Sequence, residues 1–454
     1  MDIVVKKGLD VPLKGKAFDF APFTKNIKQC ALNLEPFDDL RFKLLVKEGQ
    51  SVSIGEPLVE NKSIAGQFFA SPASGAIAEF RRGAKRRLID VVINVDGQKK
   101  LYKHDPMQTG ASKEQILERL MQGGIFPYIR MRPFNKIADP KRLPRDIFVS
   151  AVESLPYQPT AEMQVEGFEK EFQHGLDVLN LLTEGSVHLV VHKESACAAF
   201  TEAGGVCKHT VSGPHPCGSS SLHIHKIAPV TSTQDVIWSL SVTGVIAVGK
   251  MVGQGLYHID RVVGVAGEGV QPDKRNFFKA RAGLCVADLV SDKLEEQPLR
   301  LISGDPLTGQ KVSAEDFLGF DHTSCSVLLE NQKRQLLHFF RLGRKKYSAT
   351  RAYLSGHLPA PKEGAHFTTN QHGEERAFID GKVYDKVMPM RIPTMHLIKA
   401  ILAEDFELAE ELGLLEVIPE DFALASFICP SKIEMIDIVK RGLHHYAVET
   451  GHHT

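Results

Sequence analysis

Two short segments near the start of the chain carry glycines at intervals that strongly limit how this part can fold. The first is Leu44–Glu60, LLVKEGQSVSIGEPLVE, and the second is Ser71–Ile77, SPASGAI. Gly49, Gly55 and Gly75 stand where closely spaced strands must connect, and such turns need a positive φ angle, which glycine adopts at little steric cost. We therefore expect a small, flattened β-sandwich at the N-terminus.

These segments resemble the paired strands of biotinyl and lipoyl carrier domains, in which the returning strand opens on a Ser-Pro pair. A carrier domain also presents a modified lysine on a hairpin tip at a fixed distance before that pair. The candidate here, Lys62, lies ten residues before Pro72, which is longer than the lipoyl spacing, and a Met-Lys-Met of the biotin type is absent. We predict that Lys62 is unmodified and that the barrel-sandwich scaffold serves to dock onto another protein.

Charge and cysteine content limit the classes of protein to which the chain can belong. Lysine plus arginine and aspartate plus glutamate number 55 each, so no overall field favours nucleic acid. Seven cysteines, an odd number in 454 residues, indicate reduced thiols rather than disulfides. The N-terminus lacks the apolar region of a signal peptide, and the uncharged stretch 236–249 is shorter than the roughly 20 residues of a spanning helix. Membrane contact is therefore expected to be peripheral.

The middle of the chain predicts a parallel sheet. A strand at 146–152, a helix that Thr160 caps and Gly185 ends, and a strand at 187–191 follow one another. Such a βαβ unit implies parallel strands. From 211 to 252 we expect mainly short strands and turns.

The last hundred residues are predicted to be helical. Thr394 starts a helix that Gly413 stops, and Ser431–Glu434 is a capping box for another helix, which Gly442 ends. The expected fold class is α/β in several α+β domains. The predicted domain boundaries are 1–104, 105–254, 255–330 and 331–454.

The turn after the first strand of the βαβ unit argues against a nucleotide site. A dinucleotide site needs a glycine-rich turn whose N–H groups approach pyrophosphate. The turn here, Glu153–Pro159, contains an acid, two prolines and no glycine. We expect a sheet that binds neither NADH nor flavin tightly.

Several cysteines and histidines gather between residues 192 and 225, without the spacing of a cluster or zinc motif. A Cys-x2-Cys pair is missing from this stretch, so we expect it to hold no metal. Cys429 precedes a predicted helix start, which favours a thiolate, although a buried thiol is the better explanation. The residues of the stretch are Cys197, Cys207 and Cys217 with His192, His209, His215, His223 and His225.

Two basic segments stand out. Arg81–Arg87 holds five basic residues in seven, and either a contact with acidic lipid or protein or a solvated hairpin explains it equally well. Tyr128–Lys136 alternates apolar or aromatic side chains with cations, which suits an oxygen-bearing aromatic ring. A linker pinned by its arginines explains the second segment at least as well. The candidate site residues are Arg130, Arg132, Phe134 and Lys136.

Segments spread in order over 1–440 resemble the A subunit of the bacterial sodium-translocating NADH:quinone oxidoreductase. They cover most of the chain, which makes the resemblance specific. The matching segments are Lys7–Gly15, Pro72–Ile77, Arg82–Arg86, Arg130–Lys136, Gly175–Leu179, Ser212–Pro216, Asp260–Val263, Ile302–Gly304, Val387–Met390 and Phe427–Lys432.

The resemblance implies four modules: a carrier-like barrel-sandwich hybrid, a Rossmann-like domain, a β-grasp domain and a C-terminal helical domain. The flavoprotein subunit of respiratory complex I and the C subunit of Rnf complexes share such modules, but their glycine-rich loop and cluster cysteines are missing here. The family implies a chain without a redox centre in a complex that reduces ubiquinone with NADH and expels sodium. Other subunits would hold NADH, flavins and iron–sulfur clusters.

The resemblance also implies a place for the chain. It would lie peripherally on the cytoplasmic face of the bacterial inner membrane, against the membrane subunits and above all the B subunit, with Arg130–Lys136 near the quinone and inhibitor site. Two alternatives stay open: a cofactor-free assembly scaffold without quinone contact, and an Rnf-type electron-transfer subunit, which would need clusters.

Overall fold

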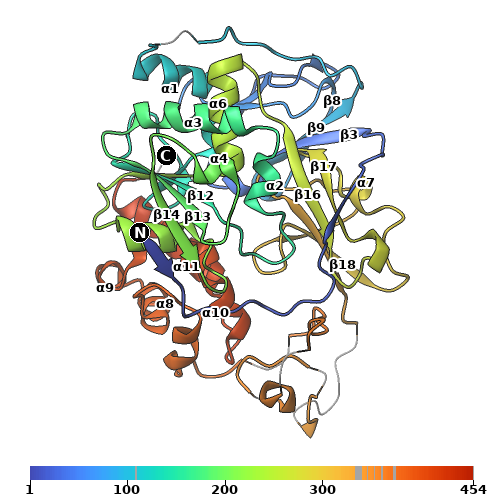
Figure 1. The fold of residues 1–454 in the computed structure, drawn as a ribbon, viewed down its shortest axis with the longest axis vertical. Coiled ribbons are helices and arrows are strands. Elements are labelled where there is room, and N and C mark those ends of the chain that lie inside the picture. Colours follow the sequence, from blue (N-terminus) through green and yellow to red (C-terminus); the bar gives the residue numbers. More distant parts are fainter. Residues whose placement is uncertain are drawn as a thin grey trace.

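The computed structural model describes residues 1–107, 110–332, 340–344, 346–351, 353–358, 361–371 and 375–452. Within these residues the strands form four sheets, and a helical region follows them, so the predicted mixed α/β class is confirmed (Figure 1). The parts of the prediction that were wrong all concern helices and their ends.

The N-terminal sandwich is built from two small antiparallel sheets, as the glycine spacing predicted. Gly49 and Gly55 have φ angles of 79° and 87°. At Gly75 a Cβ would stand 1.9 Å from the carbonyl oxygen of Asn94, so only glycine fits. Lys62 is exposed between the second sheet's β6 and β7, and its unmodified state stays a prediction. The sheets are β3 (Gln29–Asn33), β9 (Leu88–Val95), β8 (Gly75–Arg82) and β5 (Ser51–Val52), then β4 (Phe42–Leu44), β6 (Pro57–Asn61) and β7 (Phe68–Ala70), with η1 at Glu35–Phe37 and η2 at Ala84–Arg86.

A seven-stranded sheet forms the centre of the molecule and contains the predicted βαβ unit. Its four central strands run parallel, and two antiparallel strands extend one edge. Side chains alternate between the two faces, so Ile147 and Val149 join one apolar cluster while Phe148 joins another. In spatial order the strands are β1 (Asp2–Val4), β14 (Cys207–Ser212), β13 (Val187–His192), β12 (Asp146–Ala151), β15 (Ile237–Ser241), β10 (Arg130–Arg132) and β11 (Lys136–Ile137).

Helix α6 (Val242–Gln254) shows that the prediction of strands and turns over 211–252 was wrong. Its valines, isoleucine and glycines have low helix propensity, but tertiary packing outweighs that preference. At Gly249 a Cβ would meet the Glu171 carbonyl oxygen at 1.9 Å, and at Gly175 it would meet the Val245 carbonyl oxygen at 2.1 Å. The glycines therefore let α6 approach α3 (Glu169–Leu182) closely. Helix α5 (Ser220–Ile227) also lies in this stretch.

The predicted single helix from Thr160 is divided in two. Thr160 caps α2 (Ala161–Val165), as expected, because its side chain accepts a hydrogen bond from the Met163 amide. The chain then breaks at Gly167, whose φ of 85° does not occur in a helix, before α3 begins. Short helices complete this region: α1 (Lys113–Gln122), η3 (Phe126–Tyr128) and α4 (Ala198–Thr201).

A six-stranded mixed sheet follows the α/β sheet along the chain. Its strand β2 comes from the N-terminal segment and runs parallel to β17, just as β1 joins the central sheet. The domain boundaries at 1–104, 105–254, 255–330 and 331–454 therefore stay a prediction. The strands are β19 (Gln310–Val312), β18 (Leu299–Ser303), β20 (Ser324–Leu329), β16 (Asp260–Ala266), β17 (Asn276–Arg281) and β2 (Asp19–Ala21), with α7 at Val286–Val290 and η4 at Pro272–Lys274.

The C-terminal helices cover the face of the central sheet opposite α3 and α6 (Figure 1). The helix from Thr394 ends at Leu402, before Glu404 with φ of 56°, rather than at Gly413. Gly442 lies inside the last helix, where a Cβ would stand 2.5 Å from Ile401. The helices are α8 (Thr394–Leu402), α9 (Phe406–Glu411), α10 (Ala423–Ile428) and α11 (Met435–Glu449), with η6 (Leu354–His357), η7 (Gly381–Lys386), η8 (Leu414–Glu416) and η9 (Pro419–Phe422).

The capping box at Ser431–Glu434 was also wrong. The Ser431 hydroxyl donates to the Ala377 carbonyl, and α11 begins at Met435 without a side-chain cap. Because α11 begins four residues after Ser431, with Glu434 at the N-cap position, the Ser431 hydroxyl does not stand where it could cap this helix. In the described part of the chain, helices are too short or too polar to cross a membrane.

Candidate functional site

The hairpin of β10 and β11 places the four candidate residues at the edge of the central sheet. β10 pairs antiparallel with β15, so Arg130 lies opposite Ser239 and Arg132 opposite Ile237. Because side chains alternate along a strand, Arg130 and Arg132 share one face while Met131 packs into the core on the other. The alternation of the segment thus coincides with a strand that places both arginines on one face.

Arg132 is pinned inside the protein. Only 1% of the residue is exposed, and its Nη2 donates to Ser220 Oγ at 3.1 Å and Ser221 Oγ at 3.0 Å, at the start of α5. Burial lowers the pKa of Arg132, and the nearby carboxylates of Asp421 and Glu420 act in the opposite direction. The hydrogen bonds of this guanidinium therefore connect β10 to the start of α5, near the carboxylates of η9.

Asp421 is held near Arg132 by its own hydrogen bonds. It accepts from Ser219 Oγ at 2.7 Å and from the Ile418 amide at 2.9 Å. Burial raises the pKa of Asp421, and Arg132 is the strongest influence against that rise. Sequence reasoning missed Asp421, because it lies far along the chain from Arg132 and in no motif with it.

Arg130 points to a boundary between three regions and keeps part of its surface open. Its guanidinium lies 4.9 Å from the centre of the Phe37 ring, in the N-terminal sandwich, and 3.4 Å from Asp321, beside the six-stranded sheet. Its side chain is 22% exposed. Of the four candidates, Arg130 is the one whose cation lies against an aromatic ring and still meets solvent.

Phe134 and Lys136 contact the end of the last helix. Phe134 is 8% exposed, and its ring lies 6.2 Å from Tyr446 and 5.4 Å from His452, centre to centre. Lys136 Nζ donates to the His452 carbonyl at 2.9 Å, and burial lowers the pKa of this lysine. Both residues therefore join the hairpin to the C-terminal helices.

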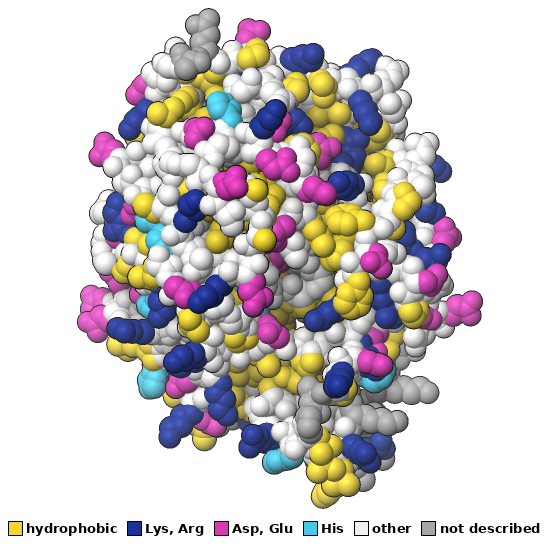
Figure 2. All heavy atoms as spheres, in the orientation of Figure 1, with side chains coloured by type: hydrophobic (Ala, Val, Ile, Leu, Met, Phe, Trp, Pro, Cys, Tyr) yellow, Lys and Arg dark blue, Asp and Glu magenta, His cyan; other side chains and the backbone are white. Residues whose placement is uncertain are grey.

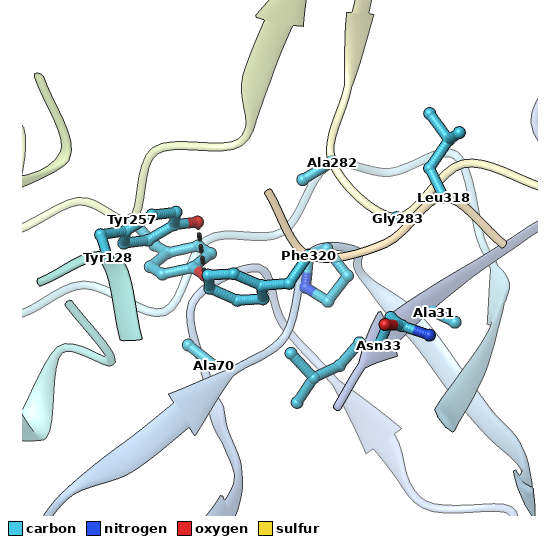
Figure 3. A pocket seen from close by; sticks show the side chains of 11 residues that line it. Ala31, Asn33, Ala70, Tyr128, Tyr257, Ala282, Gly283, Leu318 and Phe320 are labelled. Carbon is cyan, nitrogen blue, oxygen red and sulfur yellow. Dashed lines mark hydrogen bonds between the residues drawn. The ribbon is translucent and has the colours of Figure 1, made fainter. Parts of the chain in front are cut away.

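A small pocket lies near the hairpin, between the sandwich and the six-stranded sheet. Figure 3 shows Tyr128, Tyr257 and Phe320 around it, with the two tyrosine hydroxyls 3.0 Å apart. Arg261 Nη2 donates to the Tyr128 hydroxyl at 2.9 Å, and the Phe320 ring lies 4.8 Å from Tyr128. Tyr128 belongs to the basic segment Tyr128–Lys136. Its partners Tyr257, Arg261 and Phe320 lie far along the chain, where no motif in the sequence links them to it.

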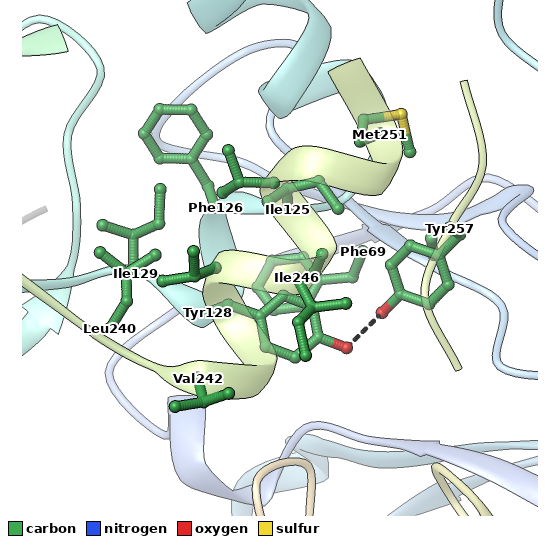
Figure 4. Packing of buried hydrophobic residues seen from close by; sticks show 14 of the residues in the cluster. Phe69, Ile125, Phe126, Tyr128, Ile129, Leu240, Val242, Ile246, Met251 and Tyr257 are labelled. Atoms are coloured by element: carbon green, nitrogen blue, oxygen red, sulfur yellow. Dashed lines mark hydrogen bonds between the residues drawn. The ribbon is translucent and has the colours of Figure 1, made fainter. Parts of the chain in front are cut away.

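The segment before the hairpin is fixed by apolar packing. Ile125, Phe126 and Ile129 are fully buried in the apolar cluster that also contains residues of α6 and Phe69 of the sandwich (Figure 4), and the Phe126 ring lies 5.9 Å from that of Trp238. This packing holds the backbone of β10 in place on one side, while Arg132 and Phe134 hold it on the other. The hairpin is thus a rigid support for Arg130.

The central sheet has the topology that commonly binds nucleotides, at the ends of β12 and β15. The chain leaves β12 toward β13 and later returns to β15 on the other side, which makes this the switch point of the sheet. At this point the backbone amides that could face a phosphate donate to side chains of the protein itself. The Leu155 amide donates to Glu153 Oε1 at 2.7 Å, and the Gly218 amide to Ser154 Oγ at 3.0 Å. This arrangement favours the expectation of a sheet without nucleotide.

The cysteines and histidines of 192–225 separate into different contacts. His188 Nδ1 lies 3.0 Å from His209 Nε2, whereas His225 Nδ1 lies 2.7 Å from Glu416. Among the described residues, groups of three or more potential metal ligands are absent. Cys429 is fully buried and lies 3.1 Å from the Tyr384 hydroxyl, so the explanation as a buried thiol holds.

The Arg81–Arg87 segment is a hairpin turn whose cations partly meet protein. Arg81 lies 2.7 Å from Glu79 and 3.6 Å from Asp316, with its guanidinium 5.0 Å from the Phe317 ring. Arg87 lies 3.6 Å from Asp38. Arg81 therefore has surroundings much like those of Arg130, at another place in the molecule.

Comparisons with known proteins match successive segments of the chain to one family. Three family models match: the NqrA N-terminal barrel-sandwich hybrid domain over 3–96, the NqrA second alpha/beta domain over 111–257 and the NQRA C-terminal domain over 262–314. A chain of an NAD+-reducing [NiFe]-hydrogenase in the air-oxidised state covers 74% of this chain and 61% of its own at 12% identity, but its TM-score of 0.37 is too low to bear on the fold.

Two relatives of nearly the same length carry the same name. The A subunit of the Na(+)-translocating NADH-quinone reductase of Chlamydia caviae is 37% identical over 99% of this chain and 98% of its own length. The protein of that name from Yersinia pseudotuberculosis is 37% identical over 95% and 96%. On these matches the chain belongs to the NqrA family, the A subunits of Na(+)-translocating NADH-quinone reductases.

Proposed function

We propose that this chain is a peripheral subunit of the sodium-pumping NADH:ubiquinone reductase, on the cytoplasmic face of the bacterial inner membrane. It supports reduction of ubiquinone, while other subunits hold NADH, flavins and iron–sulfur clusters. Its partners are those subunits, above all the membrane-embedded B subunit. The identity of 37% with reductase subunits over nearly the whole chain carries this proposal.

Within that complex, we propose Arg130 as the residue of this chain nearest the quinone. A quinone is a flat ring with two carbonyl oxygens, so a guanidinium that is both stacked and partly open recognises it by charge-assisted hydrogen bonds. Arg130 has this arrangement beside Phe37, on a hairpin that apolar packing keeps rigid. Arg132, Phe134 and Lys136 position the hairpin and do not touch the ring.

A second candidate function is that of an assembly scaffold without quinone contact. The observation in its favour is that Arg132, Phe134 and Lys136 all direct their polar or aromatic groups to the protein itself. Under this hypothesis Arg130 only joins the sandwich to the six-stranded sheet through Phe37 and Asp321.

Replacing Arg130 by glutamine in the assembled complex separates the two. A charge-assisted hydrogen bond contributes roughly 1.5–3 kcal/mol, so its loss raises the quinone Michaelis constant about tenfold or more. Arg81→Gln is the matched control, because Arg81 has the same kind of ring and carboxylate contacts. An unchanged Michaelis constant in a fully assembled Arg130→Gln complex supports the scaffold and rejects the quinone role.

The membership of the complex has its own test. Affinity purification of this chain from its native membranes should retain the other subunits and sodium-dependent NADH:quinone activity. Recovery of the chain alone, from cells whose membranes keep that activity without it, contradicts the proposed function whatever Arg130 does.

A further inference from the structure

One stretch of the chain has a charge unlike the rest. From Asn331 to Lys362 the sequence holds eight lysines and arginines and not a single aspartate or glutamate, in a chain whose acidic and basic residues are equal in number. The described parts of this stretch form a lobe at one end of the long axis of the molecule (Figure 1). We call residues 340–344, 346–351 and 353–358 the basic lobe.

The basic lobe also exposes large apolar side chains. Phe340 is 84% exposed and Leu342 is 76% exposed, and Leu354 and Leu358 are 42% and 47% exposed. Figure 2 shows hydrophobic and basic side chains gathered at this end, next to grey atoms. Apolar residues grouped in this way on a surface mark a contact with another body.

The lobe has a defined inner side that keeps these residues outward. The Leu354 amide donates to the Leu342 carbonyl at 2.9 Å, and the ring of Tyr353 lies against Gly343. Tyr347 attaches the lobe to the body, since its ring lies 5.3 Å from Phe367 and 6.0 Å from Phe427. An aromatic residue thus faces inward, while Phe340 and Leu342 face solvent.

The arginines of the lobe lie on its surface. Arg341, Arg344 and Arg351 are exposed, and ion pairs between them and carboxylates are absent among the residues that the structure describes. Arg341 stands between Phe340 and Leu342 in the sequence, so a cation alternates with apolar side chains along this segment.

We propose that the basic lobe docks on an anionic lipid surface, with Phe340 and Leu342 in the boundary between headgroups and acyl chains and the arginines among the phosphates. A lipid interface offers both chemistries at the same place, namely negative headgroups and apolar chains directly beneath them. An acidic protein surface matches the arginines alone and leaves two large apolar side chains to be accommodated separately.

This inference rests on the proposed peripheral placement and extends it from a location to a surface, yet its test needs neither the complex nor quinone reduction. The full chain is sedimented with vesicles of phosphatidylcholine alone and with vesicles that contain phosphatidylglycerol. We expect binding to the anionic vesicles only, with an affinity that falls as salt is added, because exposed charges are screened.

Two lobe variants and one control decide the outcome. Arg341→Gln with Arg344→Gln, and separately Phe340→Ser with Leu342→Ser, should each weaken vesicle binding roughly tenfold or more. Lys99→Gln with Lys100→Gln is the control, because it removes the same charge from another exposed segment, the turn after β9, and should leave binding unchanged.

The other results either overturn the lobe proposal or separate it from the proposed function. Failure of the unaltered chain to bind anionic vesicles rejects it, as does an equal loss in the control. If vesicles do not bind but the lobe variants release the chain from purified membrane subunits, the occupant is a protein. If the chain fails to join the complex yet binds vesicles through the lobe, the proposed function fails and the lobe proposal stands.

Discussion

The β10–β11 hairpin and the basic lobe use the same residue types in opposite ways. In the hairpin, Arg132 is buried against serine hydroxyls and Phe134 is packed on α11. In the lobe, Arg341 and Phe340 stand in solvent, and the phenylalanine keeps 84% of its surface exposed. Both segments place an arginine and a phenylalanine close together in sequence, so the difference lies entirely in what surrounds them.

This contrast separates residues that hold the fold from residues that remain available for a ligand. A buried cation is retained only with partners, since desolvation is costly, whereas an exposed cation adds little to stability and keeps its interaction for another body. We therefore expect hairpin substitutions to act on unfolding and lobe substitutions to act on binding. Trp238, the single tryptophan, pairs with Met131 across β15 and β10, so its fluorescence reports unfolding at the hairpin.

The largest expected effect is that of Arg132→Ala. Its removal leaves the hydroxyls of Ser220 and Ser221 without their donor and removes the cation that opposes the raised pKa of Asp421. Breaking a buried contact of this kind costs about 3 kcal/mol in the free energy of unfolding. The Trp238 transition should shift to lower temperature, and Arg132→Lys, which keeps the charge, should lie in between. A transition unchanged in Arg132→Ala contradicts the pinning role.

Phe134→Leu should come next, at about 1.5 kcal/mol. Leucine fills part of the space but loses the ring contacts with Tyr446 and His452. Phe134 has a φ of 75°, which phenylalanine and leucine disfavour alike. The difference in stability between the two therefore reports the loss of the ring. Thermal unfolding followed at Trp238 measures the effect, and a cost equal to that of Arg132→Ala shows that the two anchors are not ranked as proposed.

Local signals predicted the elements whose cause is local. The glycines of Leu44–Glu60 required tight turns, and the alternating β-branched run at Val187 indicated a strand. The prediction failed at α6, where Gly175 and Gly249 enable contact between two helices that lie far apart in the sequence. From the sequence alone, a valine-rich run that contains glycine is more typical of a strand than of a helix. The role of its glycine becomes clear only when the helix that packs against it is known.

The same limit applied to the candidate site. The sequence analysis predicted no strand at Arg130–Lys136, although the pleat of β10 is what places the two arginines on one face. Which arginine is buried depends on Phe37, Asp321 and Asp421, from three distant segments. Spacing within a segment carries no information about such partners, so the two residues could not be ranked from sequence.

Arg130→Gln should affect stability less than either anchor, by about 1 kcal/mol. Its ion pair with Asp321 is long and partly exposed, and the contact with the Phe37 ring is the main loss. Melting curves of the isolated chain give this value, with Arg81→Gln as the matched variant. A cost near that of Arg132→Ala would show that Arg130 pins the regions together. Arg130 would then belong, with Arg132, to the residues that hold the fold.

The smallest expected effect on the fold is that of the lobe variants, and it is the sharpest check of the comparison. Exposed substitutions away from caps and buried contacts change stability by about 0.5 kcal/mol or less. Arg341→Gln with Arg344→Gln, and Phe340→Ser with Leu342→Ser, should therefore leave the Trp238 transition in place while vesicle binding falls. Tyr347→Ala is the contrasting variant, because it removes the ring that packs on Phe367 and Phe427. It should loosen the lobe from the body, and a melting transition lowered as much by the exposed variants as by Tyr347→Ala would show that the lobe side chains hold the fold after all.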